Sequence, residues 1–212
     1  MNVYSILFYS LFLLVVGCER QPKDVRLDNL NAIKVDFLQS ILKGNVDESP
    51  FHLNYSLRTV FFSSEIISVF GELQVYSHLP HGWAKYEGKT YCRISGEFQE
   101  IKLGDLFPNP SQKEFLRSFC EDNLKTQPGS YFSGQFPVRS ALREDEIKYF
   151  VLDDQCLIIF FQPYTIGGLG EGLMHVRIPY NLLKGKWKDT HPILLCLDRL
   201  MTSKAYTVSS DF

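Results

Sequence analysis

The sequence lacks the short motifs that mark the commonest enzyme chemistries. It contains no HExxH, GxSxG or CxxC motif, and no two of its 5 histidines lie at ligand spacing on one predicted helix. Such motifs supply zinc ligands, a serine nucleophile or redox thiols, so a zinc hydrolase, an α/β-hydrolase and a thioredoxin-like enzyme gain no support. We therefore predict a non-catalytic protein without a metal or cofactor.

Long runs of charge are also missing, and neither sign dominates. The chain has 22 Lys and Arg against 24 Asp and Glu, which gives a net charge of −2. Nucleic-acid-binding domains usually carry a basic face, and basic segments bind anionic membranes, so neither partner is expected on electrostatic grounds. With 45% hydrophobic and 14% aromatic residues, the chain can nevertheless bury a substantial core.

The first 17 positions contain no charged residue. The apolar run from Tyr4 to Val16 is shorter than the ~20 residues that a spanning helix needs, and it lies where a secretory signal lies. It ends at Gly17-Cys18, which is typical of a bacterial lipobox. We predict a lipoprotein signal peptide over 1–17, lipidation at Cys18 and a tether over 18–26. An uncleaved anchor with a chance cysteine is the alternative. Glu19, in place of an Asp, favours the outer membrane, facing the periplasm.

Hydrophobic periodicity predicts a helix and three strands in the first half of the chain. Apolar residues recur at helical spacing from Leu27 to Leu42. Apolar and polar residues then alternate, which is typical of antiparallel strands with one solvated face. The three predicted strands cover residues 53–61, 67–75 and 83–94.

The second half predicts further helices and strands. A capping box of Ser111 and Glu114 begins a helix, and runs over 147–152 and 156–161 pair across Asp153-Asp154. We predict an α+β fold in which helices pack on one face of an antiparallel sheet or sheets. Residues 27–212 are expected to form a single domain, with two lobes, about 27–107 and 108–212, as an alternative.

A glycine-rich loop interrupts the predicted strands near the carboxyl end. Strands over 156–161 and 174–178 flank it, and a helical turn follows over 180–184. Rigidly tethered loops often carry binding residues. The candidate ligand contacts are Tyr164, Leu169, Gly170, Gly172, Leu173 and Tyr180. Tyr164 and Tyr180 form a pair in which each tyrosine follows a proline at a predicted strand end. Gly172 ends the loop just before a strand, where a positive φ is expected. Leucines on a loop are more often covered by the core, but our working hypothesis is that a partner covers Leu169 and Leu173.

Two groups of residues carry a family resemblance. The first comprises Phe161, Pro163, Tyr164, Ile166, Gly172, Val176, Ile178, Pro179, Tyr180 and Leu183. The second comprises His81, Gly82, Gly96, Ile101, Leu103, Asp105, Leu106 and Phe107. Their spacing resembles the C-terminal domain family of the anti-sigma factor RsiV and the peptidoglycan deacetylase PdaC. The resemblance implies a cell-surface setting and lysozyme binding, because that domain of RsiV is a lysozyme receptor.

The remaining candidates are one histidine and four cysteines. His81 is a possible ligand contact, and the alternative is a turn residue whose ring bonds the backbone. Cysteines in an oxidising compartment can pair, and four allow three connectivities. Predicted core positions are equally typical of buried thiols, so both outcomes stay open. The four are Cys92, Cys120, Cys156 and Cys196.

These observations together predict a non-catalytic envelope lipoprotein that binds a lysozyme-type protein or a peptidoglycan fragment. The alternative is an accessory enzyme of cell-wall hydrolysis or deacetylation. That alternative rests on the resemblance to PdaC, whose catalysis belongs to a different domain.

Overall fold

The computed structural model describes residues 25–42, 52–76, 83–133, 139, 141–167, 172–188 and 191–202. By its internal contacts the chain divides into two units, residues 1–33 and residues 34–212. Helix α2 (Val25–Leu42) spans this boundary and confirms the first predicted helix. Within the second unit, Phe37 of α2 is buried, and the Lys89 ammonium lies 5.6 Å from the centre of its ring.

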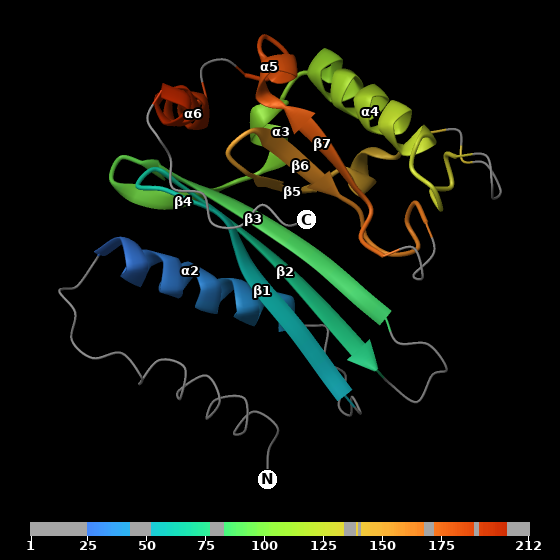
Figure 1. Ribbon diagram of the computed structural model, residues 1–212. Coiled ribbons are helices and arrows are strands. Elements are labelled where there is room, and N and C mark those ends of the chain that lie inside the picture. The colour runs from blue at the N-terminus through green and yellow to red at the C-terminus, as the bar shows by residue number, and fades with distance from the viewer. Residues whose placement is uncertain are drawn as a thin grey trace. The chain divides into compact units, whose positions relative to one another are not determined.

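The first sheet is an antiparallel meander of four strands in the order β1-β2-β3-β4 (Figure 1). Its strands are β1 (His52–Phe62), β2 (Ile66–Tyr76), β3 (Trp83–Ile94) and β4 (Glu97–Ile101). The first three confirm the strands predicted from alternation. The sequence analysis missed β4, although Ser95 and Gly96 form the tight turn before it. Both have positive φ, 53° and 91°, as a two-residue hairpin turn of type I′ requires.

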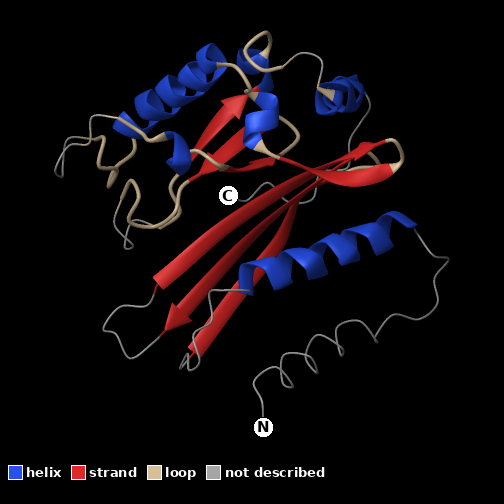
Figure 2. Ribbon diagram, turned by 180° about the vertical axis from the view of Figure 1, so that it is seen from behind, coloured by secondary structure: helices blue, strands red, loops and turns tan. Residues whose placement is uncertain are grey.

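The second sheet has three antiparallel strands in the order β5-β6-β7. They are β5 (Tyr149–Leu152), β6 (Cys156–Phe160) and β7 (His175–Pro179). Strand β6 is buried along its whole length, as its unbroken apolar run predicted. The remaining helical segments of the described chain pack on the two sheets (Figure 2). They are α3 (Leu103–Leu106), α4 (Pro110–Lys125), the 3₁₀ turn η1 (Glu144–Glu146), α5 (Tyr180–Leu183) and α6 (Pro192–Thr202).

Helix α4 begins earlier than the sequence analysis predicted. Its capping box joins Asn109 and Gln112, because the Gln112 side chain accepts a 3.1 Å hydrogen bond from the Asn109 N–H. The predicted box of Ser111 and Glu114 is therefore wrong. Pro110 explains the shift, since proline fits the first helical position and fixes the helix start before Ser111.

The two sheets meet where β3 crosses β5 and β6. Gly88 of β3 makes room there, since a Cβ on it would lie 2.5 Å from the Phe160 ring. Beside it, the Ser68 hydroxyl accepts a 3.1 Å hydrogen bond from the Leu152 N–H and lies 2.9 Å from the Thr90 hydroxyl. These contacts satisfy buried polar groups at the junction, which would otherwise be costly to bury.

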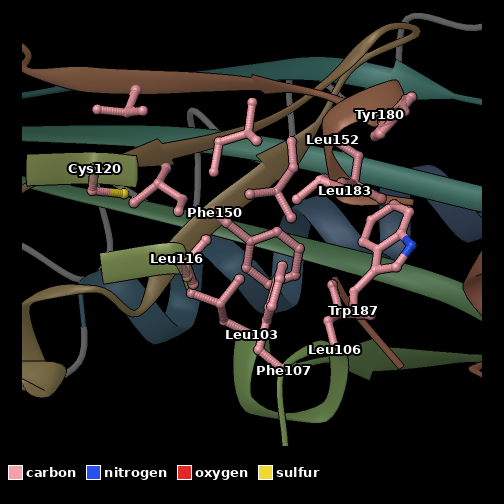
Figure 3. Packing of buried hydrophobic residues seen from close by; sticks show 14 of the residues in the cluster. Leu103, Leu106, Phe107, Leu116, Cys120, Phe150, Leu152, Tyr180, Leu183 and Trp187 are labelled. Atoms are coloured by element: carbon pink, nitrogen blue, oxygen red, sulfur yellow. The ribbon is translucent and has the colours of Figure 1, made fainter. Parts of the chain in front are cut away.

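One large hydrophobic cluster includes residues of both sheets and the helices. Figure 3 shows residues of α3, α4, β5 and α5 packed together with Phe107 and Trp187. The labelled residues are Leu103, Leu106, Phe107, Leu116, Cys120, Phe150, Leu152, Tyr180, Leu183 and Trp187. The predicted α+β class, with antiparallel sheets and packed helices, is confirmed.

Candidate functional site

The turn from Pro163 to Ile166 presents an exposed aromatic residue in an unusual backbone conformation. Tyr164 is 56% exposed, one of three large hydrophobic side chains that are exposed in the described part of the chain. Its φ is +63°, in the left-handed region that costs an L-residue other than glycine ~1–2 kcal/mol. Such strain persists only where the surrounding structure enforces it, and it is concentrated at functional sites.

Backbone hydrogen bonds hold this turn on both sides. The Tyr164 N–H donates to the Gly167 carbonyl at 3.0 Å, which closes the turn. The Tyr131 N–H donates to the Ile166 carbonyl at 2.7 Å, and Ser130 forms a bridge with Gly167. The turn is thus fastened to the segment that follows α4.

A partly buried ion pair also supports this turn. Arg139 contacts the Glu146 carboxylate through two nitrogens, at 2.8 and 3.0 Å. The same guanidinium donates to the Thr165 carbonyl at 2.7 Å. Glu146 is buried, and it also accepts a 2.8 Å hydrogen bond from the Arg143 N–H. Because bidentate Arg–carboxylate pairs have a fixed geometry, Tyr164 projects from a rigid support.

The end of the glycine-rich loop is described from Gly172 onward. Gly172 has a φ of +75° and open space around the position of a Cβ, which confirms the positive φ expected there. Leu173 is half-buried against the smaller hydrophobic cluster, which includes Val60, Phe70 and Phe160. Leu173 thus packs on the protein's own core, whereas the working hypothesis assigned it to a partner.

Tyr180 is an internal anchor. Its hydroxyl donates to the Asp153 carbonyl at 2.6 Å, and its ring stacks on Trp187 at a centroid distance of 6.0 Å. Burial raises the pKa of its phenol well above the ordinary value. The Asp153 carboxylate accepts hydrogen bonds from the Gln155 and Cys156 N–H groups at 2.7 and 2.5 Å, and it forms an ion pair with Arg177. An enclosed ring cannot contact a ligand in this arrangement, so Tyr164 is the exposed member of the predicted pair.

A hollow with a volume of about 470 Å³ lies beside α3 and α4, away from the Tyr164 turn. Its charged lining residues pair with one another. Lys113 pairs with Glu144, and Arg117 pairs with Glu114 at 2.5 Å. Since no charge is left over to attract a ligand, this hollow gives no chemical assignment.

The structure describes only part of the predicted site. Cys18, His81, Leu169 and Gly170 lie outside the described residues. Within those residues, no group of three or more His, Cys, Asp or Glu side chains could hold a metal ion. Likewise, none of the described helices is long and apolar enough to cross a membrane.

Sequence reasoning missed the support beneath the turn. Arg139 and Glu146 had no motif or periodicity that linked them to Tyr164. Arg139 contacts the turn only because the chain returns to it after β6, which a single sequence does not reveal. The exposed tyrosine itself was found, because it follows a proline at a predicted strand end.

Comparison with known proteins finds that part of the chain matches a family of unknown function. Residues 104–181 match the family model described as "Protein of unknown function (DUF3298)". This segment contains α4, the second sheet and the Tyr164 turn. No curated protein sequence matches the chain significantly.

Solved structures of DUF3298 proteins are similar to this chain. A family member from Bacteroides fragilis has a TM-score of 0.53 at 14% identity, covering 94% of this chain and 74% of that chain. A DUF3298 family protein from Pseudomonas aeruginosa has a TM-score of 0.49 at 13% identity, covering 84% of this chain and 90% of that chain. Residues 104–181 thus match the DUF3298 family, within a chain whose fold is similar to that of a solved DUF3298 protein.

Proposed function

We propose that this chain is a non-catalytic binding protein of the bacterial cell envelope, anchored by lipid on Cys18. Its ligand is a lysozyme-type protein or a peptidoglycan fragment. The Tyr164 turn is the contact surface. The observation that carries this proposal is an exposed tyrosine with positive φ in a turn that the Arg139–Glu146 pair holds through the Thr165 carbonyl.

The energetics of the turn favour a binding role over a structural one. A tyrosine that is 56% exposed gains little from packing, yet its backbone conformation costs ~1–2 kcal/mol. Exposed aromatic residues are enriched among those that dominate binding energies, and rigid support lowers the entropy lost on binding. The binding energy of a ligand that stacks on the ring would offset the strain energy of the free protein.

The choice of ligand rests on the resemblance to the RsiV and PdaC domain family. Pro163, Tyr164 and Ile166 belong to the residues that carry this resemblance. Both lysozyme and peptidoglycan are accessible to proteins that face the periplasm, which is the location that the predicted lipoprotein signal implies. Glycan rings also stack on exposed aromatic side chains, so a muropeptide suits the same tyrosine.

The test compares Tyr164→Asn with Leu195→Ala in the full chain. Both wild-type side chains are 56% exposed, so the control removes an equally exposed apolar group from α6. Binding of lysozyme and of soluble muropeptides is measured by biolayer interferometry. We expect Tyr164→Asn to weaken binding on the order of 10-fold or more, and Leu195→Ala to leave it unchanged.

The same variant separates binding from folding. Asparagine tolerates the left-handed region better than tyrosine, so Tyr164→Asn should raise the free energy of unfolding by about 1 kcal/mol. A more stable protein that has lost its ligand would establish a binding residue. Unchanged binding of both probes, or a loss of stability, would contradict the proposal.

A further inference from the structure

Two cysteines far apart in the sequence lie side by side in the core. The sulfur atoms of Cys92 in β3 and Cys196 in α6 are 3.6 Å apart, and both residues are buried. A disulfide bond is about 2.05 Å long, so a small rotation of the two side chains would bring the sulfurs within bonding distance. Among the four cysteines, the structure therefore favours a single bond between Cys92 and Cys196.

The other two cysteines have different surroundings. Cys120 lies on the buried side of α4 beside Glu121. Cys156 begins β6, where Asp153 and Arg177 are its charged neighbours. Both are buried, as is usual for cysteines that act as small hydrophobic residues.

We propose that Cys92 and Cys196 are joined by a disulfide bond in the exported protein. The two thiols lose two protons and two electrons as the S–S bond between them forms. An oxidant that itself carries a disulfide takes up both, and its own S–S bond is reduced to two thiols. Oxidants of this class act in the bacterial periplasm, whereas cytosolic conditions keep thiols reduced. The proposal is independent of the ligand that the Tyr164 turn binds.

The bond should form while the chain folds. Burial raises the pKa of the Cys92 thiol above its ordinary value, and the adjacent Cys196 adds to this effect. Thiolate is the reactive form, so a folded and reduced protein should resist an added oxidant. Oxidation is accordingly expected before α6 closes over β3.

The bond would fasten α6 to the first sheet. It links residues 104 apart in the sequence, which closes a long loop in the unfolded chain. Loops of this length give the largest expected gain from a cross-link, so reduction should lower the melting temperature on the order of 10 °C. In α6, Ile193 and Leu197 are also buried, so the helix has a site to return to when the bond is broken.

Peptide mapping tests the bond directly. The full chain is exported to a bacterial periplasm, unfolded in the presence of a thiol-blocking reagent and digested with trypsin without reduction. We expect peptide Thr90–Arg93 to be linked to peptide Asp189–Arg199, and Cys120 and Cys156 to be blocked as thiols.

Variants and a second measurement make the result decisive. The linked peptide should persist in Cys120→Ser and disappear in Cys196→Ser. Reductant should lower the melting temperature of the wild-type chain but not that of the Cys92→Ser, Cys196→Ser double variant. Recovery of Cys92 and Cys196 as blocked thiols from folded, exported protein would overturn the proposal. So would a link between any other pair.

Discussion

At the scale of single residues, Gly88 shows how one missing methyl group permits the crossing of two sheets. A Cβ at this position would lie 2.5 Å from the Phe160 ring and 2.9 Å from the Phe150 carbonyl oxygen. The ring could turn aside, but the carbonyl belongs to β5 and is fixed by its own strand. The crossing therefore depends on glycine for space rather than for backbone freedom.

We predict that Gly88→Ala lowers the free energy of unfolding by about 1–3 kcal/mol, the usual cost of overpacking a core. Gly104→Ala in α3 is the matched control, since no atom beyond its chain neighbours and its own helix backbone lies within 4 Å of the Cβ it would add. Alanine also favours helices, so the control should be neutral or slightly stabilising. Urea denaturation measures both variants, and equal effects would show that the contact with β5 relaxes.

Glycine conformations were more predictable from the sequence than the conformation of Tyr164. Gly172 was expected to have positive φ because it ends a glycine-rich loop before a strand, and its φ is +75°. Nothing in the sequence indicates a φ of +63° for Tyr164, because the residues that enforce it come from other segments. The residue type indicates where a positive φ costs little, as at glycine. Tertiary contacts determine which other residues adopt it.

At the scale of elements, Gln162 satisfies a strand edge that lacks a partner strand. β4 pairs with Thr90 to Ile94, so the β3 edge at Tyr86 has no β4 residue opposite it. The Gln162 amide fills this place: its oxygen accepts from the Tyr86 N–H at 3.0 Å, and its nitrogen donates to the Tyr86 carbonyl. One side chain thereby imitates a paired peptide group.

We predict that Gln162→Glu lowers the free energy of unfolding by about 1–3 kcal/mol. A carboxylate keeps the acceptor but loses the donor, and it sets two oxygens against each other at Tyr86. Gln112→Glu is the control, because Gln112 serves its helix cap as an acceptor alone. Thermal unfolding of the two variants compares the same chemical change in two roles. A control that fell as far as the variant would refute the bridging role.

His191 is expected to make the stability of the start of α6 depend on pH. Its Nδ1 accepts a 3.3 Å hydrogen bond from the Ile193 N–H, which caps the helix. Burial lowers the pKa of this imidazole, although Asp105 partly opposes the effect. Burial likewise lowers the pKa of His175. A group whose pKa is lowered on folding is protonated more readily in the unfolded chain, so stability should fall as the pH drops below the ordinary pKa of 6.5.

We predict that His191→Asn reduces this dependence. Asparagine is a good helix cap and does not titrate, so stability at about pH 7.5 should change little. Between about pH 7.5 and pH 5.5 the melting temperature should fall less in the variant than in the wild type. His175 remains to titrate, so some dependence persists. Parallel pH profiles would show that His191 is not a source of the acid sensitivity.

Most elements could be predicted from hydrophobic periodicity, and the exceptions have local causes. Alternation identified β1, β2 and β3, whereas β4 carries mostly exposed polar residues and gives no such signal. Its turn, Ser95-Gly96, was the usable evidence. The start of α4 shifted because two polar residues could cap it, and Pro110 decided between them.

At the scale of the whole molecule, the proposed anchor determines where the protein resides. We predict that Cys18→Ala releases the protein from membranes and abolishes incorporation of labelled palmitate. Each buried methylene of a lipid contributes ~0.8 kcal/mol, so loss of several chains removes the anchor. Glu19→Asp is the matched control: it should stay lipidated while shifting toward the inner membrane. Labelled Cys18→Ala protein would refute the lipobox assignment.

The arrangement of the two sheets was beyond sequence reasoning. The α+β class followed from alternating and helical patterns, but the crossing at Gly88 and the Ser68–Leu152 hydrogen bond join distant segments. Their side chains are ordinary in isolation: a glycine in a strand and a serine among apolar neighbours. Only the folded chain gives them a shared role.

The strand order has a consequence for the time course of folding. In both sheets each strand pairs with its neighbour in the sequence, β1-β2-β3-β4 and β5-β6-β7. Such pairings close short loops and form quickly, whereas contacts between distant segments form slowly. The Leu152 N–H and the Ser68 hydroxyl are 84 residues apart. Docking of two preformed sheets, rather than assembly of either one, is therefore expected to limit the folding rate.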